Sequence, residues 1–342
     1  MEDVAGSPPI WPWLLTPEQR KGLMVAVISG GRPKVKERPT ARLLADLHDL
    51  DLGEIVWVVS EADAASYESD AHRICTYTRE WAYEYAKAHW MLPTPPPADG
   101  FLGAFPGREA ACLEAERQGC WGVLQLDDNI LSLRVSSSPG SAARVVRNHG
   151  GLALFADMLG ALTLSTNGRM VGAQLDAVAT EVLRNARKGF PYSLFIEQVG
   201  EGREHWYGPF EDDITHAFQY GTRSDGATAV VTPWMRYFKE TQSKTGMRSK
   251  YNHERSVQLQ RIFPESAKVM VKTQKANGRG GPRIFHKMNG SAIRNPMRIT
   301  DLELFTAYKH RMDDLLAEWH VLRRAAVKEK IAARTAKIGA SS

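Results

Sequence analysis

The sequence predicts an α/β protein with an open, mostly parallel sheet, an irregular second half and a long C-terminal helix. Apolar runs at 23–28, 55–59 and 121–126, the last with one glutamine, are typical of strands that are buried on both faces of a parallel sheet. Residues with helical spacing separate these runs. A further helical pattern occupies 300–338. Strands that alternate with helices favour an open α/β sheet in the first half of the chain.

Polar turns follow the first two predicted strands. The turn after 23–28 contains Ser29, Gly30, Gly31 and Arg32, and the turn after 55–59 runs from Ser60 to Asp63. Ligands of open α/β sheets bind beyond the carboxyl ends of the strands. We therefore expect both turns at one ligand-binding rim.

The remaining elements follow from the same patterns. Helices are predicted at 40–50, 78–89, 109–118 and 151–161, and short strands at 194–197, 229–231 and 269–272. Thr300 is a good N-cap for the last helix.

The composition indicates a cytoplasmic protein. Cys75, Cys112 and Cys120 cannot all pair and show no CxxC spacing, which points to a reducing compartment and excludes a zinc ribbon or a disulfide scaffold. No apolar stretch reaches the roughly 18–20 residues that a membrane span needs. Glu2 and Asp3 stand where a signal peptide would carry lysines.

The charge is unevenly distributed. Between Arg236 and Arg298 there are fifteen Lys and Arg residues, opposed only by Glu240, Glu254 and Glu265. That segment carries +12, so the rest of the chain carries −7 within the total of +5. Such asymmetry is either a solvated basic face or a binding surface for a polyanion such as DNA, because Lys and Arg near phosphates release condensed counterions.

The strongest local motif is Asp127-Asp128-Asn129, at the end of the apolar run 121–126. Two carboxylates and an amide oxygen are hard ligands, which suit Mg²⁺ or Mn²⁺ and the phosphates that such an ion bridges. An acidic strand end can equally be an ordinary turn or helix cap.

Two later segments also carry candidate chemistry. Glu211, Asp212 and Asp213 stand at a predicted helix start, where one carboxylate could act as a general base or all could interact with the helix dipole. His286 and Lys287 follow a glycine-rich stretch. A lone histidine is as often structural as a ligand.

The ordered set of motifs resembles the GT-A family of sugar-nucleotide glycosyltransferases. The resemblance implies a GT-A-like fold in which Ser29, Gly30, Gly31, Arg32, Ser60, Asp63 and Arg108 hold the nucleotide. It implies that Asp127, Asp128 and Asn129, with His286, bind Mn²⁺ or Mg²⁺ on the diphosphate of a UDP-sugar, that Lys287 also holds the diphosphate, and that an acid among Glu211, Asp212 and Asp213 faces the acceptor. Asn129 departs from the DxD pattern, although its carbonyl can still ligate.

The implied organisation is an N-terminal arm (1–18), a GT-A-like catalytic domain (19–300) and a C-terminal helix and tail (301–342). The catalytic domain divides into a sugar-nucleotide half (19–135) and an acceptor half (136–300).

A narrower resemblance rests on the block Gly208 to Ala217 and on Gln219 to Arg223. These residues are similar to the TET-associated glycosyltransferases of bacteriophages, which implies transfer of a sugar to 5-hydroxymethylcytosine in double-stranded DNA. It also implies a functional link to a TET-like dioxygenase and a location in the host cytoplasm. A DNA acceptor would account for the basic segment, and Trp234, Tyr237, Phe238 and Tyr251, which are interleaved with it, could stack on a base or pack in the core.

Other functions fit parts of the pattern. A GT-A transferase with a protein, glycan or small acceptor, or a related nucleotidyltransferase, would use the same motifs. A non-catalytic nucleic-acid-binding protein could keep the scaffold, because fold does not fix function. A restriction-type nuclease fits less well, since no PD-(D/E)xK spacing follows Asp127 or Asp128.

Overall fold

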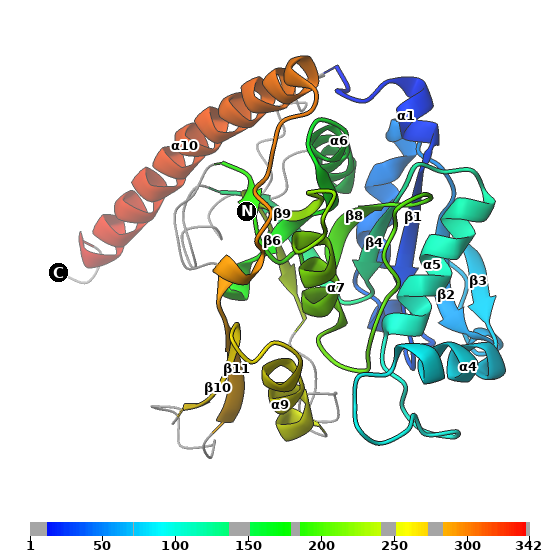
Figure 1. The fold of residues 1–342 in the computed structure, drawn as a ribbon. Coiled ribbons are helices and arrows are strands. Elements are labelled where there is room, and N and C mark those ends of the chain that lie inside the picture. The colour runs from blue at the N-terminus through cyan, green and yellow to red at the C-terminus, as the bar shows by residue number, and fades with distance from the viewer. Residues whose placement is uncertain are drawn as a thin grey trace.

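One large mixed sheet with helices on both faces forms the body of the protein (Figure 1). The computed structural model describes residues 12–70, 72–136, 151–178, 185–240, 251–272 and 283–339. The α-helices are α1 (Pro17–Lys21), α2 (Ala41–Leu44), α3 (Glu61–Ala64), α4 (Arg79–His89), α5 (Phe105–Arg117), α6 (Gly151–Leu164), α7 (Asp212–Gly221), α9 (Asn252–Ile262) and α10 (Leu302–Gly339). The strands are β1 (Leu23–Ile28), β2 (Ile55–Ser60), β3 (Arg73–Tyr77), β4 (Gly122–Asp127), β5 (Ile130–Val135), β6 (Gly168–Leu175), β7 (Arg187–Lys188), β8 (Leu194–Gln198), β9 (Thr228–Lys239), β10 (Ala267–Lys272) and β11 (Arg283–Met288).

The large sheet has the strand order β3-β2-β1-β4-β8-β6-β9-β5, with β7 paired to β9. The first four strands in this order are parallel to one another, and β8 joins β4 in the antiparallel direction. Ile28 at the end of β1 is in register with Val58 of β2 and with Asp127 of β4. The α/β prediction is therefore confirmed, and the ends of these three strands share one rim.

The sheet is covered on both faces because its central strand is apolar on both sides. Leu23, Val25 and Val27 of β1 pack into a core with α6, α10 and the segment 43–50. The alternate residues Met24, Ala26 and Ile28 pack into a second core with α4, α5 and α7. A continuous apolar run is what a strand between two such layers requires.

The helix predicted at 40–50 is interrupted. Its first turn is α2, and residues Ala45–Leu50 form a 3-10 helix. The helix predicted at 109–118 begins earlier, at Phe105. The second half of the chain contributes β6, β8 and β9 to the same sheet, and β6 and the strands β3 and β5 were not predicted from the sequence.

Helix α10 begins at Leu302, two residues after the predicted cap. The Asp301 carboxylate accepts a hydrogen bond from the Leu304 backbone N–H at 3.0 Å, so Asp301 caps the helix and the assignment to Thr300 was wrong. Tyr308, Met312 and Trp319 are buried. The second half of the helix projects away from the sheet (Figure 1). Within the described residues, every helix is too short or too polar to cross a bilayer.

Candidate active site

The acidic motif forms a turn that Thr40 holds in place. Thr40 Oγ1 donates a hydrogen bond to the Asp127 carbonyl oxygen at 2.7 Å and accepts one from the Ile130 N–H at 2.9 Å. The Thr40 N–H also donates to the Asp128 carbonyl oxygen at 3.2 Å. A buried threonine thus fixes the backbone on both sides of Asp128 and Asn129. The sequence gives no sign of this contact, because Thr40 lies 87 positions before Asp127.

The turn after β1 meets the acidic motif at the rim. Asp128 accepts hydrogen bonds from Ser29 Oγ at 2.6 Å and from a terminal nitrogen of Arg32 at 2.8 Å. On the other side, the Gly31 N–H donates to the Asp63 carboxylate at 3.3 Å. Ser60 caps α3 by accepting from the Asp63 N–H at 3.2 Å, and Gly30 lies close to the same carboxylate. The predicted turn residues therefore come together beyond β1 and β2.

The Asp128 carboxyl makes a pH-dependent contribution to stability. Burial raises its pKa from 3.8 to about 6, although Arg32 and Ser29 oppose the change. The folded protein then binds this proton more tightly than the unfolded chain, so stability is lost as pH rises from about 4 through about 6. The difference between the two pKa values corresponds to about 3 kcal/mol. We expect Asp128→Asn to be more stable than the wild type at pH 7.5 by up to this amount, measured by urea unfolding.

The same comparison at pH 4 supplies the control. Both side chains are then mostly neutral, and the stability gap between Asp128→Asn and the wild type should shrink. An equal difference in the free energy of unfolding at both pH values would show that the titration of Asp128 is not its cause. The altered hydrogen bonds with Ser29 and Arg32 would then explain it.

Asp127 has a contrasting environment. Burial favours the neutral acid, but Lys239 and Arg108 outweigh it and hold the pKa of Asp127 well below its ordinary value. Arg108 donates to Asp127 at 2.9 Å, and the Lys239 ammonium donates to the other carboxylate oxygen and to Ser193 Oγ. Lys239, from the end of β9, is a site residue, whereas its place in the sequence indicates only that it belongs to the basic segment.

Arg108 connects the two acidic motifs. It is 3% exposed, and its Nε donates to the Asp212 carboxylate at 2.8 Å while a terminal nitrogen reaches Asp127. Arg108, which the family resemblance implies as a residue that holds the nucleotide, therefore lies in the interior and contacts both Asp127 and Asp212. One buried guanidinium fixes the end of β4 relative to the start of α7.

The three acids at the start of α7 differ in their partners. Glu211 has a left-handed backbone conformation, with φ of 51°, and pairs with Arg255 of α9. Asp212 pairs with Arg108. Burial, followed by the charges of Asp212 and Glu211, raises the pKa of Asp213 well above its ordinary value. Within the described part of the chain no basic side chain forms an ion pair with Asp213.

Two residues of the site have a backbone conformation that is rare for residues other than glycine. Glu211 has φ of 51°, and Ser193, beside Lys239, has φ of 49°. Non-glycine residues with positive φ cluster at functional sites.

A buried carboxylate supports Arg108 from behind. Glu197 of β8 is fully buried and accepts hydrogen bonds from His216 at 2.6 Å, Tyr220 at 2.9 Å and Gln125 at 3.1 Å. The Gln125 carbonyl in turn accepts a long hydrogen bond, 3.4 Å, from Arg108. These residues were not predicted, because their positions in the sequence resemble ordinary strand and helix residues.

Of the predicted pair His286 and Lys287, the structure describes the side chain of Lys287 only. His286 lies in β11, in register with Val269 of β10, but its side chain lies outside the described residues. Lys287 is exposed on the same hairpin, opposite Lys268. In the described part of the structure no ion pair joins Lys287 to Asp127 or Asp128, and the roles of His286 and Lys287 at the metal and diphosphate stay predictions.

The donor set of the acidic turn suits a divalent cation. Asn129 is 2% exposed, and its side-chain oxygen Oδ1 has no hydrogen-bond partner among the described residues. An unpartnered buried oxygen next to Asp128 is the type of ligand that Mg²⁺ and Mn²⁺ accept. The described residues contain no group of three or more His, Cys, Asp or Glu side chains arranged around one point. The residues that fit an ion are therefore Asp128, Asn129 and Asp127, the last of which now pairs with Arg108 and Lys239.

Comparisons with known proteins add a fold-level similarity. No protein-family model and no curated protein matches the chain. Eighteen chains of solved structures match. One is a mycobacterial protein, 11% identical, with a TM-score of 0.45 over 84% of this chain and 93% of that chain. Another is glucosyl-3-phosphoglycerate synthase from Mycobacterium tuberculosis in complex with Mg²⁺ and uridine diphosphate, 10% identical, with a TM-score of 0.45 over 80% and 92% of the two chains. Because these identities and TM-scores are low, the function proposed below is inferred from the geometry of the site and not from these structures.

Proposed function

We propose that this protein is a glycosyltransferase that moves a sugar from a UDP-sugar to 5-hydroxymethylcytosine in DNA, with a divalent metal ion. The observation that carries the proposal is the convergence of two acidic motifs on Arg108, beside the glycine turn that follows β1. Such a site offers oxygen ligands and cations for a diphosphate on one side. On the other it offers a carboxylate with a raised pKa for an acceptor hydroxyl.

The donor side is built from the rim of the parallel strands. Ser29, Gly30 and Gly31, with Ser60 and Asp63 of the neighbouring turn, would hold the nucleotide. Asp127, Asp128 and Asn129 would hold the ion, with His286 as a further ligand, and the ion would stabilise negative charge on the departing diphosphate. Arg32 and Lys239 are partly exposed cations beside the same carboxylates, so they can turn from those carboxylates to the phosphates.

Asp213 is the best placed of the three acids to accept the proton of the acceptor. Glu211 and Asp212 are each paired with a guanidinium, so their carboxylates are already engaged by Arg255 and Arg108. Asp213 has a raised pKa and is not fully buried. Its carboxylate would remove the hydroxyl proton as the acceptor oxygen attacks the anomeric carbon in an inverting transfer.

Exposed basic residues around α9 and the β10–β11 hairpin support a polyanionic acceptor. Arg261, Lys268, Lys287, Arg294 and Arg298 of the basic segment are exposed. Arg236 is not available to DNA, because it is fully buried and pairs with Asp176. Lys239 and Arg255 belong to the acidic site instead. The predicted DNA surface is thus smaller than the sequence segment. The side chains of seven further basic residues lie outside the described residues: Lys244, Arg248, Lys250, Lys272, Lys275, Arg279 and Arg283.

Some aromatic residues of the same segment are buried in the core, and others are partly exposed. Trp234 and Tyr237 of β9 are fully buried, so they pack in the core and cannot stack on a base. Phe238 is partly buried under the Arg134 guanidinium. Tyr251 is partly exposed just before α9 and remains a candidate for stacking.

The proposal is tested by incubating the protein with UDP-glucose or UDP-N-acetylglucosamine, Mn²⁺ and duplex DNA that contains 5-hydroxymethylcytosine. We expect mass spectrometry of the digested nucleosides to show an increment of one hexose or one N-acetylhexosamine, according to the donor, which is absent with unmodified DNA and abolished by Asp127→Ala. Metal-dependent release of UDP without an increment would keep the transferase and exclude the DNA acceptor. DNA binding without UDP release would favour a non-catalytic binding protein.

A further inference from the structure

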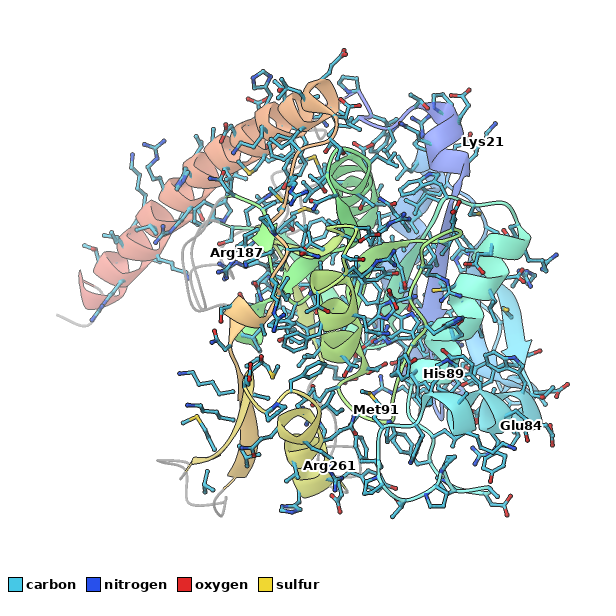
Figure 2. The ribbon with its side chains drawn as sticks, viewed as in Figure 1. Lys21, Glu84, His89, Met91, Arg187 and Arg261 are labelled. Carbon is cyan, nitrogen blue, oxygen red and sulfur yellow. The ribbon has the colours of Figure 1, made fainter. Side chains whose placement is uncertain are left out.

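Three aromatic rings meet next to the acids at the start of α7. The ring centroids of Phe101 and Tyr251 lie 5.4 Å apart with an angle of 16° between their planes. Phe210, the residue before Glu211, lies 5.3 Å from Tyr251 and 6.3 Å from Phe101. The rings come from the loop after α4, from the start of α7 and from the start of α9. Figure 2 shows Met91 of that loop and Arg261 of α9 in the lower part of the molecule.

Phe101 is exposed although its loop is fixed. It is 41% exposed, whereas the next residue, Leu102, is 5% exposed and anchors the loop in the second core. Gly103 has φ of +97°, and a Cβ there would lie 2.4 Å from the Pro209 carbonyl oxygen, so the backbone passes directly against the segment that leads into Glu211. An exposed aromatic ring on an anchored backbone is a preformed contact surface.

Helix α9 connects the aromatic rings to the acidic residues at the start of α7. Tyr251 stands one helical turn before Arg255, which pairs with Glu211. Gln258 of the same helix donates a hydrogen bond to the Phe210 carbonyl oxygen at 2.9 Å. Two residues separate Phe210 from Asp213. Helix α9 therefore fixes the rings and the acids relative to one another.

We propose that Phe101 and Tyr251 form a subsite that stacks on a planar heterocycle, the nucleobase of the acceptor. This inference rests on the proposed function and extends it, because it assigns residues to the recognition of the base. An enzyme that flips its target base out of the duplex, or that acts on single-stranded DNA, unstacks the base, and an aromatic face replaces the lost stacking. Stacking accepts any base, so this subsite supplies affinity rather than sequence preference.

The test measures stacking directly, with a single-stranded oligonucleotide that contains 2-aminopurine, a base whose fluorescence is quenched when it stacks. We expect the full-length wild type to bind and quench this probe. Phe101→Ala should bind about 5- to 150-fold more weakly, with the quenching lost, since one base–aromatic stack contributes about 1–3 kcal/mol. Phe101→Trp should retain both. Leu113→Ala on α5 removes a side chain of equal exposure, 41%, and should change neither.

The affinity of each variant for UDP, measured by calorimetry, separates this inference from the proposed reaction. Phe101→Ala should bind UDP as the wild type does, and a loss of UDP affinity would place the ring in the donor site and overturn the inference. Equal oligonucleotide binding and quenching by the wild type and Phe101→Ala would also overturn it, even if sugar transfer to DNA occurs. Phe101-dependent quenching without sugar transfer would uphold the stacking subsite and reject the proposed reaction.

Discussion

Replacement of Asp213 by Asn is expected to lower the rate of sugar transfer by about 10²- to 10⁴-fold, the usual contribution of general acid–base catalysis. The structural reason is that Asp212 and Glu211 are each paired with an arginine, whereas Asp213 has a raised pKa and no ion-pair partner among the described residues. Initial rates at saturating UDP-sugar and acceptor measure the effect. The affinity for UDP should not change.

The pH profile provides the sharper readout. In the wild type, the rate should rise with pH through the pKa of Asp213, because only the carboxylate accepts a proton. Asp213→Asn should remove that limb. If the variant keeps both the rate and the limb, the base is another residue.

The stability of this variant should change in the opposite direction to its activity. A partly buried carboxyl with a raised pKa destabilises the folded state as the pH rises, since its charged form is less well solvated there than in the unfolded chain. Asn removes the charge. Asp213→Asn should therefore unfold at the same or a higher urea concentration at pH 8, which excludes misfolding as the cause of lost activity.

Local patterns were enough to predict the rim of the site. The runs at β1 and β2 are apolar on both faces and Gln125 is the one polar residue before Asp127 in β4, so the sequence predicts that their carboxyl ends lie together, and the structure places Ser29 against Asp128. The strands β3 and β6 carry no comparable pattern. β3 is an edge strand with partly exposed residues, and β6 contains two glycines and an arginine.

The partners of the acids could not be predicted, because they depend on tertiary packing. Thr40 and Lys239 lie far from Asp127 in the sequence, and Glu197 lies far from Gln125, so only the tertiary fold brings each pair together. Charge counts were misleading for the same reason. Arg236 contributes to the +12 segment, but β9 carries its side chain into the interior.

The largest loss of stability is expected for Arg108→Met. Methionine fills a similar volume but leaves the Asp212 carboxylate without its ion-pair partner, whereas Asp127 keeps Lys239. Removing one member of a buried ion pair costs about 3–5 kcal/mol, because the remaining charge is neither solvated nor paired. Urea unfolding at pH 7 measures this loss, and sugar transfer should be abolished in the same variant.

The double variant Arg108→Met/Asp212→Asn distinguishes an electrostatic role from simple packing. If the cost arises from the unpaired carboxylate, neutralising Asp212 should restore part of the stability, and the two substitutions should not be additive. Activity should not return, because the turn at Asp127 and the start of α7 would no longer be joined. Additive losses would mean that Arg108 acts through its contacts with the Phe195 and Trp206 rings, 5.4 Å and 5.2 Å from its guanidinium carbon, and that the two acidic motifs are positioned independently.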